Sequence, residues 1–252
     1  MKKIIGMLFM VFLLCVMVSS ASALSVLGTT QNLGSYGYGV GDWGNMTAAL
    51  NTATSNQFDT VPNFENLSQM LTYDALWLDC RNTSLTATEY NNIQSFIATG
   101  RRVVMIGENS SWTAWNQQIV GMNGGTYGGQ EVSGTASSVI SNALTNGAPS
   151  VYLPTAGVVA SGGTALYVPN FATLWGNNVL TVLDVNIFSN TFWGSENNGI
   201  FATNVANWVA GSSGPTPVQP IPTLNEWGMI LLSLAMAGAG LVYMKRRRQD
   251  AM

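Results

Sequence analysis

The chain has 252 residues, of which 47% are hydrophobic and only 8% are charged, and it contains no histidine. The absence of histidine excludes Ser-His-Asp and Cys-His nucleophilic mechanisms as they are usually built, and it excludes histidine-based zinc or iron sites. Between Leu24 and Gly211 the chain carries ten acidic residues but three arginines. We expect no nucleic-acid partner for such an acidic body, because phosphate contacts need a surface of lysine or arginine.

The first 23 residues have the composition of an export signal. Lys2-Lys3 give a positive start, residues 4–18 are apolar, and Ala21-Ser22-Ala23 is a small-residue cleavage site. This order of segments is that of a secretory signal peptide. We therefore predict that Ala21 and Ala23 define the cleavage site for signal peptidase. The secretion machinery is then the first partner of the chain, and the body comprises residues 24–211.

Within the body, short apolar runs alternate with amphipathic segments, which is typical of an α/β sheet with helices on its faces. The apolar runs predict strands at 25–30, 58–61, 73–80, 102–107, 151–159, 165–168 and 179–184. The amphipathic segments predict helices at 42–54, 65–71, 86–99, 111–120, 138–144 and 197–209, the last with Ile200, Phe201, Val205 and Trp208 facing inward. The glycine-rich stretch 121–134 is expected to be a surface loop. We find no internal repeat.

The clearest local signal is a helix start at Thr86-Ala87-Thr88-Glu89. A threonine followed three residues later by glutamate is a capping box, with the two side chains satisfying each other's backbone N–H groups. Apolar residues then recur at helical spacing until Gly100, which is a typical residue just beyond a helix end. An apolar strand at 102–107 follows, so this region predicts a β-α-β unit.

Together these features resemble the class I glutamine-amidotransferase-like fold, a flavodoxin-like arrangement of three layers around a parallel sheet. The resemblance rests on residues 73–79, the helix after Thr86, residues 102–108 and the ending Leu183-Asp184 with Asn197-Asn198, Asn204 and Asn207-Trp208. Catalytic members of that class place a cysteine in a strand-to-helix elbow and pair it with a histidine. The matching turn here, 107–110, has no cysteine. The resemblance therefore implies the fold without the amidotransferase activity.

Three acids, Asp79, Glu108 and Asp184, stand at or just past the ends of predicted strands. If those strands are parallel neighbours, the carboxylates converge on one rim of the sheet, where they could bind a cation or act as an acid/base pair. The alternative is that each carboxylate accepts hydrogen bonds from a nearby helix or loop amide. An extracytoplasmic hydrolase that uses this rim stays open as an alternative function, but the sequence favours no catalytic activity, no metal and no cofactor.

Other chemically distinctive residues have plainer explanations. Cys80 is the one cysteine of the body and ends a core strand, so it is expected to be a small buried hydrophobe rather than a reactive thiol. Ser110 lacks the second glycine of a nucleophile elbow and is expected to cap a helix. The glycine-rich segment 34–39 has neither the lysine nor the spacing of a phosphate-binding loop.

Four aromatic residues, Tyr36, Tyr38, Trp43 and Tyr127, lie in or near glycine-rich segments. Exposed rings there could stack on sugars, because aromatic faces combine apolar area with a polar edge. This observation keeps a carbohydrate-binding module as a further alternative. The competing explanation is local packing of these rings against the body.

The tail begins with a Gly/Ser/Pro linker at 212–220 and continues with a sorting-like segment at 221–252. An uncharged run of 18 residues, 227–244, is at the lower edge of the length that crosses a bilayer as a helix. The cations that follow predict that this end stays in the cytoplasm and that the body lies outside. The residues that carry these predictions are Ile221, Pro222, Thr223, Leu224, Trp227, Gly228, Lys245, Arg246, Arg247 and Arg248.

This tail resembles the IPTL-CTERM sorting signal of Gram-negative bacteria, which is similar to the PEP-CTERM type; Asn225 departs from it, since serine is common at that position. The resemblance implies a membrane protease of the exosortase class as a partner, with an ordinary single-pass anchor as the alternative. We therefore predict an exported protein, anchored at least transiently in the inner membrane with its body outside the cytoplasm. The expected final site is the cell envelope, cell surface or extracellular matrix, where the non-catalytic body binds a ligand or partner, and an exopolysaccharide is one candidate.

Overall fold

The computed structural model describes residues 24–211. The predicted signal peptide, linker, sorting segment and transmembrane helix all lie outside these residues. Among the helices of residues 24–211, none has the length and apolar character needed to cross a membrane.

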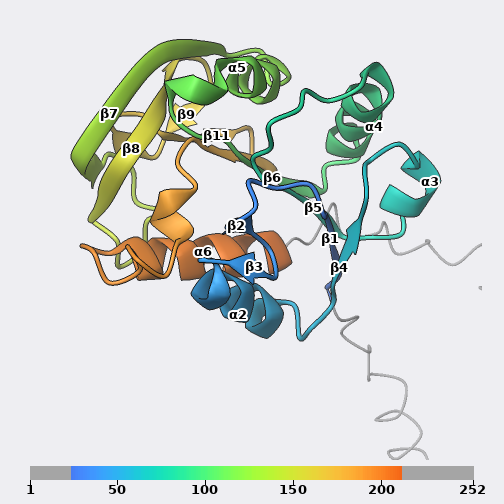
Figure 1. The fold of residues 1–252 in the computed structure, drawn as a ribbon, viewed down its shortest axis with the longest axis horizontal. Coiled ribbons are helices and arrows are strands. Elements are labelled where there is room, and N and C mark those ends of the chain that lie inside the picture. The colour runs from blue at the N-terminus through green and yellow to red at the C-terminus, as the bar shows by residue number, and fades with distance from the viewer. Residues whose placement is uncertain (1–23, 212–252) are drawn as a thin grey trace, which may run out of the picture. The chain divides into compact units, whose positions relative to one another are not determined.

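A seven-stranded sheet forms the centre of the body (Figure 1). The first five strands in spatial order run parallel to their neighbours, and the last two are antiparallel additions. An α/β fold with a mostly parallel sheet is therefore confirmed. The strands in spatial order are β4 (Phe58–Val61), β1 (Val26–Thr29), β5 (Ala75–Leu78), β6 (Arg102–Ile106), β12 (Val179–Val182), β11 (Ala172–Trp175) and β9 (Thr164–Ala165).

Helices lie on both sides of this sheet (Figure 1). On one side α2 (Gly44–Ala53) and α6 (Asn198–Ala210) lie next to each other, and on the other side are α3 (Leu67–Met70) and α4 (Ala87–Ala98). The single-turn helix η1 (Ser110–Trp112) leads into α5 (Thr113–Gly121), and η2 (Asn186–Phe188) follows β12. Every residue of β1, β5 and β12 is buried, as expected for parallel strands covered on both faces.

Aromatic side chains fill the space between the sheet and the α2/α6 layer. Trp77 of β5 contacts Trp43, which stands at the start of α2, with ring centroids 6.4 Å apart. Trp43 also meets Phe188 of η2 edge-on at 5.4 Å, and Phe188 stacks on Phe201 of α6 at 6.2 Å. Edge-to-face and stacked pairs of this kind add stabilisation beyond their buried area. One chain of rings therefore joins the sheet to both helices.

The capping box at the start of α4 is present as predicted. The Thr86 hydroxyl accepts a hydrogen bond from the Glu89 N–H, and the Glu89 carboxylate accepts one from the Thr86 N–H. Gly100, just beyond the helix end, has a φ of +79°, a left-handed conformation that glycine adopts without a steric penalty. Glu89 is also buried and forms an ion pair with Arg81 at 2.7 Å.

The predicted helix at 138–144 is wrong, and the segment 121–134 lies largely at the surface as predicted but is mostly a strand rather than a loop. Most of this region is β7 (Thr126–Ser138), which pairs antiparallel with β8 (Ser150–Ser161) and with the short β10 (Tyr167–Val168). Only two residues of β7 are buried, so the strand shows no alternation of apolar and polar residues. Its register also shifts at several points, where irregular pairing accommodates the glycines. Residues 139–147 form turns.

Three smaller corrections concern the same half of the chain. The expected strand at 165–168 is split, because β9 joins the large sheet and β10 joins the β7/β8 sheet. Strand β11 was not expected, although it is buried between its neighbours β12 and β9. Ile200, which was expected to face inward, is 45% exposed.

The glycine-rich segment near residue 36 forms a small hairpin of β2 (Tyr36–Gly37) and β3 (Val40–Gly41).

Replacement of Glu89 by glutamine tests the buried ion pair. Glu89→Gln leaves the buried Arg81 charge without its counter-ion, which costs about 3–5 kcal/mol in other proteins. We expect a comparable fall in the free energy of unfolding, measured by urea denaturation. The matched control is Thr86→Ala, which removes the cap and an exposed hydrogen bond to Glu65 but leaves the ion pair, and it should cost about 0.5–2 kcal/mol. Equal losses in the two variants would contradict this account of Arg81.

Candidate functional site

The structure places Asp79, Glu108 and Asp184 just beyond the carboxyl ends of β5, β6 and β12. These strands are parallel neighbours in the sheet, so all three acids belong to the same edge. In open α/β sheets ligands bind outside this edge. All three side chains are nonetheless buried, with exposed fractions of 1%, 3% and 0%. They lie beneath the surface and do not flank an open cleft.

Asp79 is held by donors from its own chain. Its two carboxylate oxygens accept hydrogen bonds from the Trp77 indole at 2.7 Å and from the Tyr38 backbone N–H at 3.0 Å. Burial raises the pKa of Asp79 to about 7, although these two hydrogen bonds act in the opposite direction. Asp79 thus accepts a hydrogen bond from a loop amide of the β2/β3 hairpin, which is the alternative to catalysis that the sequence suggested. This bond holds the hairpin against the end of β5.

Glu108 lies at the centre of a second network. Its carboxylate accepts hydrogen bonds from the Val185 N–H at 2.9 Å and from the side-chain amides of Asn109 and Asn186. Its backbone N–H and carbonyl are both bound by Asn116 of α5, which is completely buried. Burial raises the pKa of Glu108 to about 7 against these hydrogen bonds. The network joins the loops that follow β6 and β12.

Asp184 has one carboxylate oxygen that accepts the Asn186 N–H at 2.9 Å and another, Oδ2, that has no hydrogen-bond partner. Its pKa is raised well above the usual value, first by burial and then by the charge of Glu108. A neutral acid is the form that such an environment favours. No group of three or more acidic or cysteine side chains in the described part of the chain is arranged to hold a metal ion.

Cys80 follows Asp79 and is completely buried. Burial and the nearby Glu108 and Asp79 charges raise the pKa of its thiol above the usual range. The thiolate is the reactive form of cysteine, and this environment disfavours it. The geometry therefore fits the expected small hydrophobe and does not fit a nucleophile.

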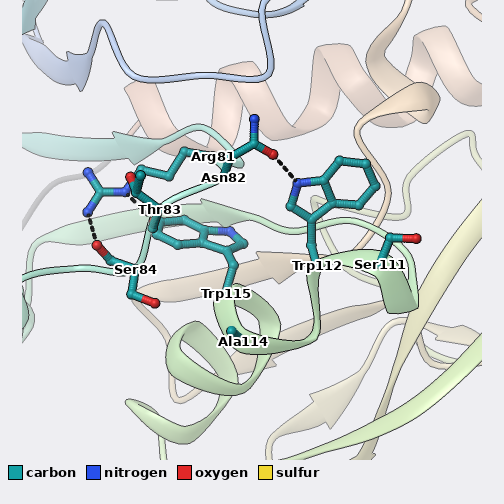
Figure 2. A pocket seen from close by; sticks show the side chains of 8 residues that line it. All are labelled: Arg81, Asn82, Thr83, Ser84, Ser111, Trp112, Ala114 and Trp115. Atoms are coloured by element: carbon teal, nitrogen blue, oxygen red, sulfur yellow. Dashed lines mark hydrogen bonds between the residues drawn. The ribbon is translucent and has the colours of Figure 1, made fainter.

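An open pocket of ≈ 210 Å³ lies at the same edge of the sheet, between the loop that follows β5 and the start of α5 (Figure 2). One wall comes from the loop and the other from η1 and α5. The lining residues are Arg81, Asn82, Thr83, Ser84, Ser111, Trp112, Ala114 and Trp115. Hydroxyl, amide and indole groups therefore dominate the lining.

Arg81 is the one charged residue of the pocket lining, but its guanidinium is fully engaged inside the protein. Its five N–H groups reach both oxygens of Glu89, the Gln31 side chain, and the carbonyls of Thr83 and Ser84. The guanidinium also lies over the Trp115 ring, 5.2 Å from its centroid. Because arginine has five N–H donors, none remains for a ligand. Arg81 shapes the pocket floor without presenting a free cation.

Trp112 and Asn82 join the two walls of the pocket. The Trp112 indole N–H donates to the Asn82 side-chain oxygen at 3.0 Å, across the gap between α5 and the β5 loop (Figure 2). The amide nitrogen of Asn82 has no partner among the described residues, and Asn82 is exposed. The neighbouring Trp115 is 3% exposed and donates to the Ile106 carbonyl, so it belongs to the core.

Neither Trp112 nor Asn82 is singled out by the sequence alone. Trp112 falls within the helix predicted at 111–120, and the sugar-stacking candidates lie elsewhere. The useful signal was positional, because the loops after β5 and β6 stand at the carboxyl edge where α/β sheets bind ligands.

The aromatic residues expected to stack on sugars do not form a platform. Trp43 is completely buried and donates its N–H to the Val185 carbonyl, and Tyr127 is 8% exposed. The Tyr38 ring stacks on Phe58 at 3.8 Å. Tyr36 is half-buried against the core. Local packing is therefore the correct explanation for this group.

The helix-capping role expected for Ser110 is also wrong. Asn109 is the residue whose side chain accepts the Ser111 N–H. Ser110 donates its hydroxyl to Glu131 of β7 instead. The turn thus fastens the β7 strand to the start of α5.

Comparison with known proteins gives a match for the tail and a likeness for the body. The IPTL-CTERM motif matches residues 219–249. This motif indicates an exported protein that is sorted within the cell envelope. No curated protein matches the chain.

Two solved structures resemble the chain at low sequence identity. The mmIFT52 N-terminal domain has a TM-score of 0.58 at 10% identity and covers 75% of this chain and 99% of its own. A ThuA-like protein from Parabacteroides merdae has a TM-score of 0.47 at 12% identity, with 80% and 93% covered. The first shows a shared fold and nothing of function.

The buried acids predict an unusual dependence of stability on pH. A carboxyl group with a raised pKa in the folded state binds a proton that the unfolded chain has already lost between pH 4 and 7. The contribution of these groups to stability is therefore greatest below about pH 4 and falls as the pH rises toward the folded-state pKa values of about 7 for Asp79 and Glu108. Glu89, whose pKa is lowered in the folded state, acts in the opposite direction at acidic pH. Asp184→Asn keeps the acceptor for Asn186 and removes one such acid.

We expect Asp184→Asn to unfold like the parent at pH 4 and to be more stable at pH 8. The sign of the difference follows from the raised pKa, because the variant lacks the ionised carboxylate that burial disfavours. Urea denaturation at both pH values measures it. Asp42→Asn, which removes an equal charge from a carboxylate without a hydrogen bond in residues 24–211, is the control. A loss of stability for Asp184→Asn at pH 8 would show that the ionised carboxylate is the stable form.

Proposed function

We propose that this chain is an exported protein whose tail delivers a non-catalytic, ligand-binding body to the cell envelope, the cell surface or the extracellular matrix. The observation that carries the first part is the match of residues 219–249 to the IPTL-CTERM motif. A signal peptide at 1–23 supplies export. The span 227–244 and the cations 245–248 hold the chain in the inner membrane, at least transiently, until a protease of the exosortase class acts on the segment around Ile221–Gly228.

For the body we propose a flavodoxin-like, three-layer domain related to the class I glutamine amidotransferases in fold and not in activity. The five parallel strands lie in the order β4-β1-β5-β6-β12, which corresponds to 2-1-3-4-5 when only these strands are numbered along the chain. That order is one of the two common doubly wound arrangements. Glu108 and Asn109 occupy the turn where a catalytic cysteine would stand.

Burial argues for binding rather than catalysis at the sheet edge. A glycosidase-type acid pair flanks the scissile bond of a bound substrate. Here Asp79 and Glu108 use their oxygens on internal donors, and Asp184 is completely buried. The pocket beside them is open and lined by uncharged polar groups and indoles, which supports a ligand-binding role. The hydrolase stays the second candidate because the three acids share this edge.

The charge distribution supports a partner other than a nucleic acid. Arg101 donates to the carbonyls of Leu71 and Tyr73, and Arg102 lies over the Trp208 ring at 4.8 Å. The body has three arginines against ten acidic residues, and all three arginines make contacts within it. Phosphate binding needs free lysine or arginine. An exopolysaccharide of the envelope is a partner compatible with a neutral pocket on an acidic surface.

Mass spectrometry of the mature protein from a Gram-negative host that carries the sorting protease tests the delivery mechanism. We expect an N-terminus at Leu24 and a C-terminus within Ile221–Trp227. Replacement of Pro222 and Thr223 by alanine should leave the N-terminal cleavage unchanged and abolish the C-terminal one. An unprocessed chain from Met1 to Met252 in the cytosol would contradict export. Cleavage after Ala23 with an intact Met252 would contradict sorting and leave a simple anchor.

A further inference from the structure

The ligand chemistry of the pocket follows from what its walls can and cannot offer. Free N–H donors with positive charge bind an anionic ligand most strongly, but the one cation of the lining, Arg81, uses all five of its N–H groups on the protein. None of the eight lining residues is acidic, so a cationic ligand finds no counter-charge either. The walls therefore select an uncharged ligand.

A purely apolar ligand fits equally poorly. The hydroxyl groups of Ser84 and Ser111 and the amide nitrogen of Asn82 line the pocket, and an apolar group would cover them without offering a hydrogen bond. Of the two indoles in the lining, Trp112 is partly exposed, whereas Trp115 is buried and lies under the Arg81 guanidinium. Polar groups beside an aromatic face match a ring with hydroxyls on its rim and C–H groups on its faces.

We propose that the pocket binds a single neutral pyranose ring, with Trp112 as the stacking surface and Asn82 as the principal hydrogen-bond donor. This inference names the ligand class of the binding body proposed above and rests on that proposal. The volume of ≈ 210 Å³ is below the ~300–1,000 Å³ of pockets for drug-sized ligands, which suits one ring. The indole N–H holds the Asn82 oxygen and so leaves its NH₂ group for a sugar hydroxyl.

The geometry also assigns separate roles to the two tryptophans. Trp115 is fixed by its hydrogen bond to Ile106 and by the guanidinium above it, so it keeps the floor rigid. Trp112 has its one hydrogen bond to Asn82, and both residues belong to the surface. Changes at Trp112 and Asn82 should therefore alter binding without unfolding the body.

Isothermal titration calorimetry on the mature exported protein tests this inference. The probes are uncharged hexoses (glucose, galactose, mannose and N-acetylglucosamine), with glucuronate and inorganic phosphate as charged comparisons. We expect millimolar binding of at least one neutral hexose and weaker binding of both charged probes. A neutral oligosaccharide of the same hexose distinguishes the two sources of the ligand. If the pocket binds the end of a polysaccharide, the oligosaccharide should bind at least as tightly as the monosaccharide. If it binds a free monosaccharide, the monosaccharide should bind more tightly than the oligosaccharide.

Variants locate the binding. Trp112→Ala and Asn82→Ala should each weaken it about two- to tenfold, the fold-change that corresponds to the loss of one stacking contact or one hydrogen bond. Trp193→Ala changes another half-buried tryptophan outside the pocket and should bind like the parent. Circular dichroism checks that each variant is folded.

Several outcomes would overturn the inference. Tighter binding of glucuronate or phosphate would show that a cation is available in the pocket. Unchanged hexose affinity in folded Trp112→Ala and Asn82→Ala would place the ligand elsewhere. The absence of any hexose binding by the folded parent protein would refute the ligand class. None of these results bears on export and sorting, which the terminal masses measure separately.

Discussion

The arrangement around Arg81 is the contact on which the sheet edge depends. The buried guanidinium joins Gln31 after β1, the loop after β5 and Glu89 at the start of α4, and it lies over Trp115 of α5. Four segments of the chain thus meet at one charge. A buried cation is tolerated only when it is paired and its donors are satisfied, and both conditions hold here. Because every N–H group of Arg81 is bound within the protein, Arg81 offers no free donor to the adjoining pocket.

The three carboxyl groups at the other part of this edge are also buried, but no charged partner balances them. Asp79, Glu108 and Asp184 have no cation beside them, and burial raises the pKa of each. They are stable because loop amides donate to them or because a proton neutralises them. The edge where α/β proteins commonly carry out chemistry is therefore occupied by internal hydrogen bonds. What stays accessible is the neutral pocket between the β5 loop and α5.

The sequence predicted the elements whose signals are local and failed where tertiary context decides. Thr86 and Glu89 specify a helix start by direct contact, and the runs around Leu76, Val104 and Leu180 are buried on both faces, so each was predictable. Strand β7 carries polar residues and glycines along an exposed ribbon, and only its partner β8 makes it a strand. The sequence could predict that the three acids lie on one edge of a parallel sheet. It could not predict that the acids are buried or that Arg81 is enclosed, because both depend on loops without a periodic pattern.

The enclosed state of Arg81 can be measured directly by ¹⁵N nuclear magnetic resonance of the guanidinium N–H groups in the folded protein. The account predicts that these groups exchange slowly with water and that their resonances do not move when inorganic phosphate is added. Fast exchange, or a shift of the Arg81 resonances on addition of phosphate, would show an accessible cation. That result would contradict the neutral character of the pocket.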